Sequence, residues 1–355
     1  MSGLSARIVV KVGDFHLDVD LKVAKDETVA LLGPNGSGKS TIVAALAGLI
    51  PLYHGSIELD GKILDLPRGN TMVAPQHRRI GVVFQDYLLF DHMSVRDNIV
   101  FGLTSRSMGK KKATRTAGNL IKALGLSELL DKMPSQLSGG QAQRVALARA
   151  MAFEPDMLLL DEPLAALDVA TRNRTRHLLS EVLSGFNGPR LLITHDPADA
   201  FILADRVHVL EKGRIVQTGS PDDLRRHPRT PFVAALAGTN LFGGVADQGS
   251  VTLNDHDQTI RIADTAVEGP VLVTIHPSAV ALHRDEPVGS ARNLWSATIG
   301  SIESLGDTMR ITLSDPLPVV VDVTPDAVSS LGLQTGSPVW ASVKATEIMA
   351  SPASP

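Results

Sequence analysis

The order of apolar and polar residues indicates a chain built from short strands and amphipathic helices. Residues 14–23 alternate strictly between polar and apolar side chains, which predicts an antiparallel strand with one buried face. Later in the chain come short apolar runs with turn or charged residues around them. Such runs are typical of parallel strands that are buried on both faces. They are residues 28–32, 81–84, 157–160 and 191–193.

Helical patterns lie between these runs, at residues 39–50, 141–153 and 168–183. The stretch of about 86–154 is helical almost throughout, which predicts a helical insert. Two turn dipeptides, Asp60-Gly61 and Lys212-Gly213, each stand between strand-like stretches and predict hairpins. Strands that alternate with helices predict a doubly wound α/β fold.

The pattern changes near residue 240. From there the chain consists of short β-type stretches separated by Gly, Pro, Asp and Asn, which predicts an all-β domain of barrel type. We therefore expect an α/β domain over residues 1–239 and a β-rich domain over residues 240–355. The predicted strands are residues 259–262, 271–275, 295–302, 309–313, 319–323 and 339–343.

Composition and charge exclude several classes of protein. The chain has 355 residues, 43% of them apolar and 20% charged, which predicts two folded domains. Its net charge of −4 gives no basic excess to hold a polyanion, so nucleic acid is not an expected partner. The absence of Cys excludes disulfides, thiol catalysis and Cys-ligated metals. No apolar stretch approaches the roughly 18 residues that span a bilayer, and the first residues lack a signal-peptide pattern, so we expect a cytoplasmic protein.

A phosphate-binding loop is predicted between an apolar run and a helix. Gly33-Pro34-Asn35-Gly36-Ser37-Gly38-Lys39-Ser40 fits the pattern G-x-x-x-x-G-K-[ST], and we include Thr41 in the site. The glycines let successive backbone N–H groups point at a phosphate, and the helix dipole favours the anion. Lys39 is expected to reach the β- and γ-phosphates, and the Ser40 hydroxyl to bind Mg²⁺.

Two acids follow the apolar run 157–160. Asp161 is placed to hold the Mg²⁺ shell, and Glu162 is placed to polarise an attacking water. Acid pairs after strands are also common as plain turn or cap residues. The phosphate loop earlier in the chain favours the catalytic interpretation.

A third motif resembles one family. Leu137-Ser138-Gly139-Gly140-Gln141, followed by a helix that contains Arg144 and Arg149, resembles the signature of the ATP-binding cassette (ABC) ATPases. The resemblance covers residues of about 7–237. Ser138 and the glycine N–H groups stand at a helix start and form a second anion site, so Ser138, Gly139, Gly140 and Gln141 are expected to contact ATP.

The resemblance suggests roles for four more positions. Gln85 resembles the glutamine that contacts Mg²⁺ and water, and His195 the switch histidine that reaches the γ-phosphate. Ala166-Leu167-Asp168 resembles a loop that crosses a dimer interface, and Phe15 is a candidate to stack on adenine. The plainer interpretations are a surface glutamine, a structural histidine, a helix cap at Asp168 and a core position for Phe15.

The family implies a fold, cofactors and partners for this chain. The fold is an α/β P-loop NTPase, an ABC ATPase core with a helical subdomain, followed by a C-terminal all-β OB-like (TOBE) domain. ATP and Mg²⁺ are the implied cofactors. One phosphate loop and one signature per chain imply a head-to-tail homodimer. Integral membrane permease subunits are the implied partners, with an extracytoplasmic solute-binding protein acting indirectly, at the cytoplasmic face of the membrane.

The second domain suggests the transported solute. Ser290-Ala291-Arg292-Asn293 and Val343-Lys344-Ala345 resemble the β domain of molybdate importer ATPases, with a Mop-like part of about 288–350. We therefore expect uptake of molybdate or tungstate. Sulfate, polyamine, iron or sugar remain alternatives. An oxyanion sensor built on Arg292 and Lys344 is another, although Ala327 lacks the hydroxyl that molybdate-binding relatives tend to have.

Two questions stay open at this point. A non-transport ABC ATPase is a less favoured alternative, because such proteins usually carry two cassettes, long charged linkers or zinc inserts, which this chain lacks. The basic cluster of Lys110, Lys111, Lys112 and Arg115 is interpreted as a solvated helix face, and it could also steer the chain toward a membrane partner.

Overall fold

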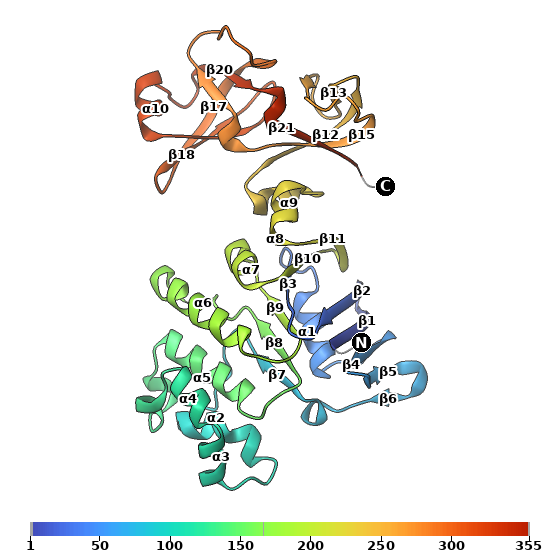
Figure 1. The fold of residues 1–355 in the computed structure, drawn as a ribbon, viewed down its shortest axis with the longest axis vertical. Helices are drawn as coiled ribbons and strands as arrows, with labels where there is room; N and C mark the ends of the chain where they lie inside the picture. The colour runs from blue at the N-terminus through green and yellow to red at the C-terminus, as the bar shows by residue number, and fades with distance from the viewer. Residues whose placement is uncertain (1–2, 166, 354–355) are drawn as a thin grey trace. The chain divides into compact units, whose positions relative to one another are not determined.

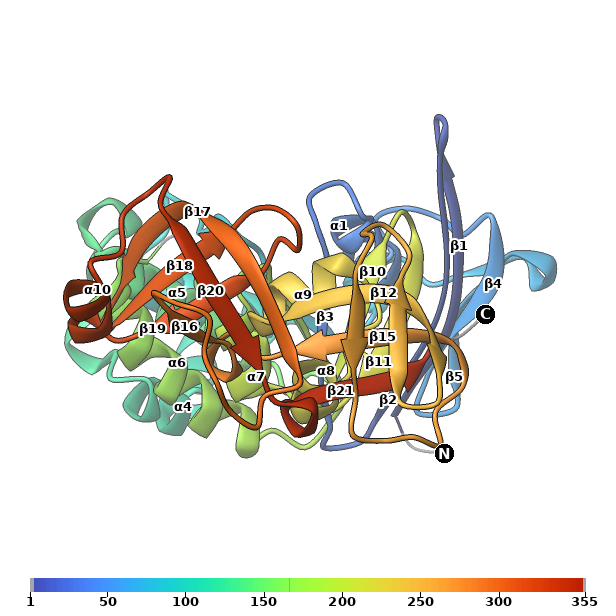
Figure 2. The ribbon, with the colours of Figure 1, turned by 90° about the horizontal axis from the view of Figure 1, so that it is seen from above.

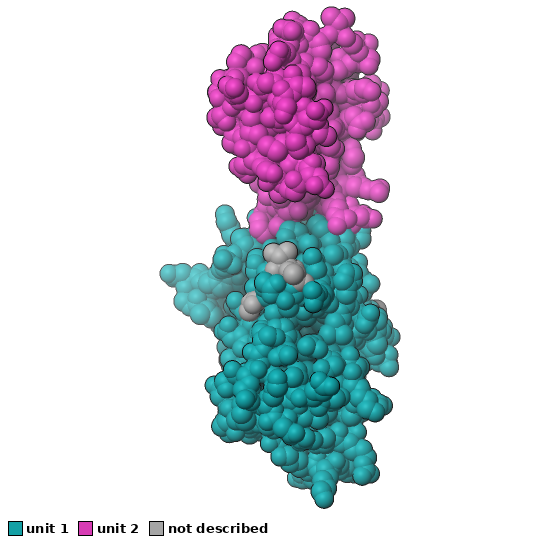
Figure 3. All heavy atoms as spheres, turned by 90° about the vertical axis from the view of Figure 1, so that its left-hand side faces the viewer, with its two compact units in different colours: residues 1–221 teal, residues 222–355 magenta. Residues whose placement is uncertain are grey.

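The computed structural model describes residues 3–165 and 167–353, which form two compact units (Figure 3). The first unit ends at Pro221 and the second begins at Asp222. The sequence predicts the boundary after residue 239. Helices α8 (Pro221–Arg226) and α9 (Pro231–Ala237) lie between these positions, and α9 packs against the first strand of the second unit.

A mostly parallel sheet forms the centre of the first unit. Within the described residues its order is β11-β10-β3-β9-β8-β7, with only β11 antiparallel to its neighbour. Every residue of β3 and β9 is buried, as expected of strands covered on both faces. The strands are β3 (Thr28–Leu32), β7 (Ile80–Val83), β8 (Met157–Asp161), β9 (Arg190–Ile193), β10 (Arg206–Glu211) and β11 (Arg214–Gly219). The four predicted buried strands are confirmed.

An antiparallel sheet lies beside it, in the order β2-β1-β4-β5-β6 (Figure 1). The predicted alternation appears in β2, where Leu17, Val19, Leu21 and Val23 are buried while most polar side chains are exposed. Both predicted hairpins are confirmed, because Asp60, Gly61, Lys212 and Gly213 all have positive φ, as tight hairpin turns require. The strands are β1 (Gly3–Val12), β2 (Phe15–Ala24), β4 (His54–Leu59), β5 (Lys62–Leu66) and β6 (Thr71–Met72).

Helices of the insert gather on one side of the parallel sheet, opposite the antiparallel strands (Figure 1). Their apolar faces share a core with β8 and α6. The insert comprises α2 (Val95–Thr104), α3 (Lys110–Thr116), α4 (Gly118–Ala123) and α5 (Gly139–Met151). The other helices of the first unit are α1 (Lys39–Ala47), α6 (Val169–Ser184) and α7 (Pro197–Leu203). None of the described helices is long and apolar enough to cross a membrane.

The second unit contains two five-stranded sheets in the described range, ordered β14-β13-β12-β15-β21 and β16-β20-β17-β18-β19. Figure 2 shows β12, β15 and β21 side by side. The strands are β12 (Asn240–Asp247), β13 (Ser250–Leu253), β14 (Thr259–Arg261), β15 (Gly269–Ile275), β16 (Ala281–His283), β17 (Asn293–Leu305), β18 (Thr308–Leu313), β19 (Val320–Val323), β20 (Pro338–Val343) and β21 (Ile348–Pro352). The prediction of a β-rich domain is confirmed, and it did not include one short helix, α10 (Pro325–Leu331), which Thr324 caps.

A buried arginine holds the carboxyl end of α1. The Arg78 side chain is fully buried and its Nη1 donates to the carbonyls of Ala45 and Leu46, at 2.8 and 2.7 Å. Its Nε donates to the carbonyl of Val73 at 2.8 Å. Asp65 lies 3.6 Å from the guanidinium. Burial raises the pKa of Asp65, and the attraction of Arg78 partly opposes that rise. The last carbonyls of α1 thus have donors that the helix itself cannot supply.

Arg78→Met should lower the free energy of unfolding of the first unit by about 3–5 kcal/mol, because it leaves the buried Asp65 without its cation. Urea unfolding followed by far-UV circular dichroism measures the loss. Asp65→Asn is the matched control, and it should cost less because Arg78 keeps its hydrogen bonds to the carbonyls of Ala45, Leu46 and Val73. Trp295 and Trp340 belong to the second unit, so their fluorescence follows that unit separately. An unchanged circular-dichroism midpoint in Arg78→Met would contradict this role.

Candidate functional site

A polar cavity of about 250 Å³ lies where the parallel strands of the first unit end. The phosphate loop enters it from β3, Gln85 from the segment after β7, and the two acids from the end of β8. The lining residues are Phe15, Asn35, Gly36, Gly38, Lys39, Ser40, Thr41, Gln85, Asp161, Glu162 and Ile193. The structure thus brings together the predicted phosphate, metal and water-activating residues from three separate segments.

Two glycines of the loop are required by their surroundings. A Cβ on Gly33 would lie 2.2 Å from the carbonyl oxygen of Leu210. Gly38 has φ of 110°, and a Cβ there would lie 2.9 Å from the Phe15 ring. Phe15 packs against the core and also lines the cavity, so its position fits both interpretations made from the sequence. Stacking on adenine stays a prediction.

Lys39 is almost entirely buried beside the two acids. Its Nζ donates to the carbonyls of Gly33 and Pro34, at 2.7 and 3.0 Å. Burial lowers the pKa of Lys39, while the charges of Glu162 and Asp161 act to raise it. The pKa of Asp161 is raised by burial and by Glu162, and Lys39 opposes that rise. One ammonium group therefore faces two carboxylates in a pocket that is poorly hydrated.

Glu162 is held in a constrained position next to His195. Its φ of 49° lies in the left-handed region, which costs a residue other than glycine about 1–3 kcal/mol. The backbone N–H of Glu162 donates to the carbonyl of Ile193 at 2.9 Å. Its Oε2 lies 2.7 Å from Nδ1 of His195. The glutamate side chain is 12% exposed and the histidine 58%, so the histidine remains open to a ligand.

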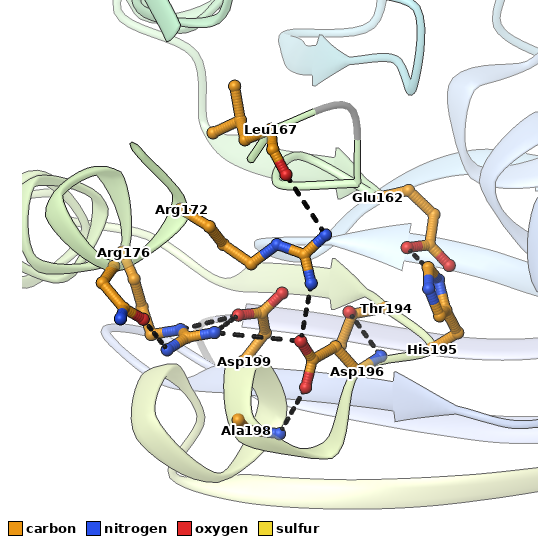
Figure 4. A network of polar contacts seen from close by, with 10 residues as sticks. Glu162, Leu167, Arg172, Arg176, Thr194, His195, Asp196, Ala198 and Asp199 are labelled. Atoms are coloured by element: carbon orange, nitrogen blue, oxygen red, sulfur yellow. Dashed lines mark hydrogen bonds and ion pairs between the residues drawn. The ribbon is translucent and has the colours of Figure 1, made fainter. Parts of the chain in front are cut away.

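An ion-pair network supports the segment that carries His195 (Figure 4). Arg172, on α6, donates to Asp196 Oδ2 at 3.1 Å and to the carbonyl of Leu167 at 3.5 Å. Arg176, one turn further along, pairs with Asp199 at 2.5 Å. Asp196 also caps α7 by accepting from the N–H of Ala198. The segment before α6 and the segment after β9 are thereby joined.

The predicted signature residues stand apart from this cavity. None of Ser138, Gly139, Gly140 and Gln141 is among the described residues that line it. Ser138 caps α5 and forms a capping box with Gln141. A Cβ on Gly140 would meet the Thr171 side chain at 2.9 Å, so the start of α5 lies against α6. The contact of these residues with ATP stays a prediction.

The loop expected to cross a dimer interface is described only in part. Ala166 lies outside the described residues. Asp168 accepts a hydrogen bond from the N–H of Thr171 at 3.0 Å and caps α6, as one of the sequence interpretations expects.

Sequence reasoning missed the network around Arg172 and Arg176. The two arginines are four residues apart, which places them on one face of α6, and this spacing could have been noticed in the sequence. Their partners Asp196 and Asp199 are more than 20 positions away, at separations of 24 and 23. No local pattern indicates such a pairing.

The donor groups of the cavity suit a small divalent cation. The Ser40 hydroxyl, the Gln85 amide and the Asp161 carboxylate supply the oxygen ligands that Mg²⁺ prefers. A cation would also favour the charged form of Asp161, which burial disfavours. In the described part of the chain no three His, Asp or Glu side chains form a metal-binding group.

A second cavity, of about 610 Å³, lies in the second unit. Lys344, Ser290 and Ser342 are among its lining residues, whereas Arg292 and Ala327 are not among those described there. Asn293 joins the two segments singled out in the sequence, since its side chain donates to the carbonyl of Val343 at 3.3 Å. Lys344 thus fits the suggested oxyanion contact better than Arg292 does.

Comparisons with known proteins agree with this architecture. A family model described as ABC transporter matches residues 17–165, and one described as TOBE domain matches residues 289–350. A solved structure of cbiO1 from Clostridium perfringens, described as part of the ABC transporter complex cbiONQ, has 31% sequence identity and a TM-score of 0.56. It covers 63% of this chain and 90% of that chain. The predicted α/β P-loop core and C-terminal TOBE domain are confirmed.

Two curated relatives align over nearly the full length. The molybdenum import ATP-binding protein ModC of Mycobacterium tuberculosis is 39% identical over 99% of this chain and 98% of its own. The sulfate/thiosulfate import ATP-binding protein CysA of Mycobacterium bovis is 38% identical over 95% of this chain and 90% of its own. The chain therefore belongs to the ATP-binding proteins of ABC transporters, in the form that carries a C-terminal TOBE domain.

Proposed function

We propose that this chain binds and hydrolyses ATP to energise an importer, with Glu162 as the general base. The observation that carries the proposal is the placement of Lys39, Asp161 and Glu162 in one cavity with the phosphate loop. Lys39 and the loop N–H groups compensate the charge of the β- and γ-phosphates. Ser40, Gln85 and Asp161 would hold Mg²⁺, which would neutralise phosphate charge.

Glu162 accepts a proton from the attacking water. Its carboxylate is positioned by the 2.7 Å contact with His195 and by the left-handed backbone of the residue itself. General-base catalysis of this kind typically contributes about 10²- to 10⁴-fold to the rate. The exposed ring of His195 contacts the γ-phosphate. Because Asp196 follows His195 and pairs with Arg172, a movement of His195 on ATP binding would also move this ion pair.

A complete site requires a second copy of the chain. The signature residues Ser138 to Gln141 lie outside the cavity of their own chain, and each chain has one phosphate loop and one signature. In a head-to-tail homodimer, each signature would cover the nucleotide on the partner's phosphate loop. ATP then closes the dimer and hydrolysis opens it.

An apolar groove beside Gln85 provides a surface for a permease. Val82, Phe84, Leu88, Phe101 and Phe153 line it, and Leu88 and Phe101 are 55% and 38% exposed. Exposed apolar side chains gathered in a groove favour docking of a partner segment. We place this chain at the cytoplasmic face of the membrane, bound to integral permease subunits that receive solute from an extracytoplasmic binding protein.

Molybdate or tungstate is the proposed solute. The proposal rests on the Ser290 to Asn293 and Val343 to Ala345 segments and on the 39% identity to a molybdenum import protein. The 38% identity to a sulfate import protein makes sulfate the principal alternative. Oxyanion sensing in the cavity beside Lys344 stays a separate prediction, because cationic and hydroxyl donors there could bind a tetrahedral dianion.

Glu162→Gln should lower kcat for ATP hydrolysis by roughly 10²- to 10⁴-fold while nucleotide binding is kept, because only proton acceptance is lost. Steady-state hydrolysis and equilibrium nucleotide binding measure the two effects. The variant should also form a dimer when ATP is added, detected by light scattering. Glu58→Gln, an exposed carboxyl on β4, is the matched control. Hydrolysis by Glu162→Gln at the parental rate would exclude Glu162 as the base.

Shared sites predict complementation between two inactive chains. Lys39→Ala removes phosphate binding, and Ser138→Arg blocks the signature, so each homodimer should be inactive. A mixed dimer retains one intact loop opposite one intact signature, and mixing should restore ATP hydrolysis. The control combines wild-type chains with chains that carry both substitutions, since their mixed dimers contain no intact site. If affinity tags prove that mixed dimers form and ATP hydrolysis is still not restored, the two chains do not share their sites.

The solute assignment is tested in cells. A strain without this chain should lose molybdenum-enzyme activity when molybdate is scarce and regain it when molybdate is in excess. Complementation with the parental chain should restore activity at scarce molybdate, and complementation with Glu162→Gln should not. A strain that instead requires sulfate, polyamine or iron would overturn the solute while leaving the ATPase proposal intact.

A further inference from the structure

The chain immediately after Gln85 adopts a strained backbone. Tyr87 and Leu88 are consecutive residues other than glycine with positive φ, 59° and 44°. The N–H of Leu88 donates to the carbonyl of Asp86 at 2.6 Å, which makes a three-residue turn around Tyr87. A turn of this kind with positive φ at its centre is rare and unfavourable. Some other contact must therefore hold it.

One side chain contacts both strained residues. Nη2 of Arg149 donates to the carbonyl of Tyr87 at 2.7 Å, and Nη1 donates to the carbonyl of Leu88 at 2.6 Å. The guanidinium also lies over the Phe90 ring, 5.3 Å from its centroid. The two carbonyls can face one planar guanidinium only while the turn keeps its shape.

Arg149 is unusual because it is a partly buried cation whose partners are not acidic. Burial lowers its pKa, and no carboxylate pairs with it among the described residues. A partly buried cation whose partners are backbone carbonyls and a ring depends on the geometry of those partners. The Tyr87 ring is 8% exposed and is anchored in the core that α5 shares, so the turn is held from two sides.

We propose that Arg149 is a positioning residue for Gln85. By holding the turn over residues 86–88, Arg149 fixes the direction in which the chain leaves Gln85 and so keeps the Gln85 amide in the nucleotide cavity. Arg149 is near the carboxyl end of α5, and Ser138 caps the other end, so the same helix links the Gln85 turn to the signature. This inference rests on the proposed role of Gln85 in hydrolysis.

The test compares Arg149→Met with Arg106→Met in the full-length protein. Arg106 also lies over a ring of the same groove, 4.7 Å from the centroid of Phe153, but within the described part of the chain its side chain forms no hydrogen bond with the turn. In Arg149→Met the amides of Tyr87 and Leu88 should exchange with deuterium roughly tenfold faster. The kcat for MgATP should fall by about tenfold, while KM changes by less than about twofold, because Gln85 is misdirected and the phosphate loop is untouched. Arg106→Met should change neither the deuterium exchange of the turn nor kcat.

Two further variants separate positioning from packing. Arg149→Lys keeps the charge but lacks the planar fork whose two nitrogens reach the two carbonyls, so it should give intermediate exchange and kcat. It serves as the test if Arg149→Met does not fold. Leu88→Asn added to Arg149→Met should restore part of kcat, because asparagine tolerates positive φ better than leucine. A folded Arg149 variant with parental exchange and parental kcat would overturn the inference. The same assay on Glu162→Gln tests the proposed function independently. If Glu162→Gln loses turnover while the Arg149 variant behaves like the parental protein, only the positioning role of Arg149 is rejected.

Discussion

A buried ammonium group that feels the charge of two carboxylates is the interaction on which the nucleotide site of the first unit depends. Lys39 loses most of its hydration, and Asp161 and Glu162 lie close enough for each to influence its pKa. The carbonyls of Gly33 and Pro34 accept its hydrogen bonds here. Phosphate oxygens would replace them with stronger, charge-assisted partners, and a divalent cation would balance the second carboxylate. The charges of the site would thus complement a metal-bound polyphosphate.

Much of this arrangement could be predicted from sequence because its signals are local. Fully apolar runs predict β3, β8 and β9, and parallel strands bring their carboxyl ends, and hence Lys39 and Glu162, to one edge. The turn dipeptides Asp60-Gly61 and Lys212-Gly213 likewise predict both hairpins, because a tight turn is determined by adjacent residues. The short helix α10 was missed because the strands on both sides of it dominate the pattern.

The contacts that position the reactive groups were not predictable in this way. Arg149 reaches carbonyls 62 and 61 positions away, and Arg172 reaches Asp196 across 24 positions. These contacts depend on how α5 and α6 pack against the segments that follow β7 and β9, and no periodicity along the chain encodes that packing. The left-handed backbone of Glu162 is equally invisible in sequence, since no glycine or asparagine marks the position. Residue identity therefore indicated the chemistry, and tertiary packing supplied its geometry.

The central claim is that two chains share each ATP site, and the concentration dependence of the wild-type ATPase tests it most directly. Hydrolysis per chain should rise with protein concentration and level off where light scattering shows that dimers have formed, because a single chain offers its phosphate loop no signature. Hydrolysis per chain that stays constant down to concentrations at which only monomers are present would contradict the account.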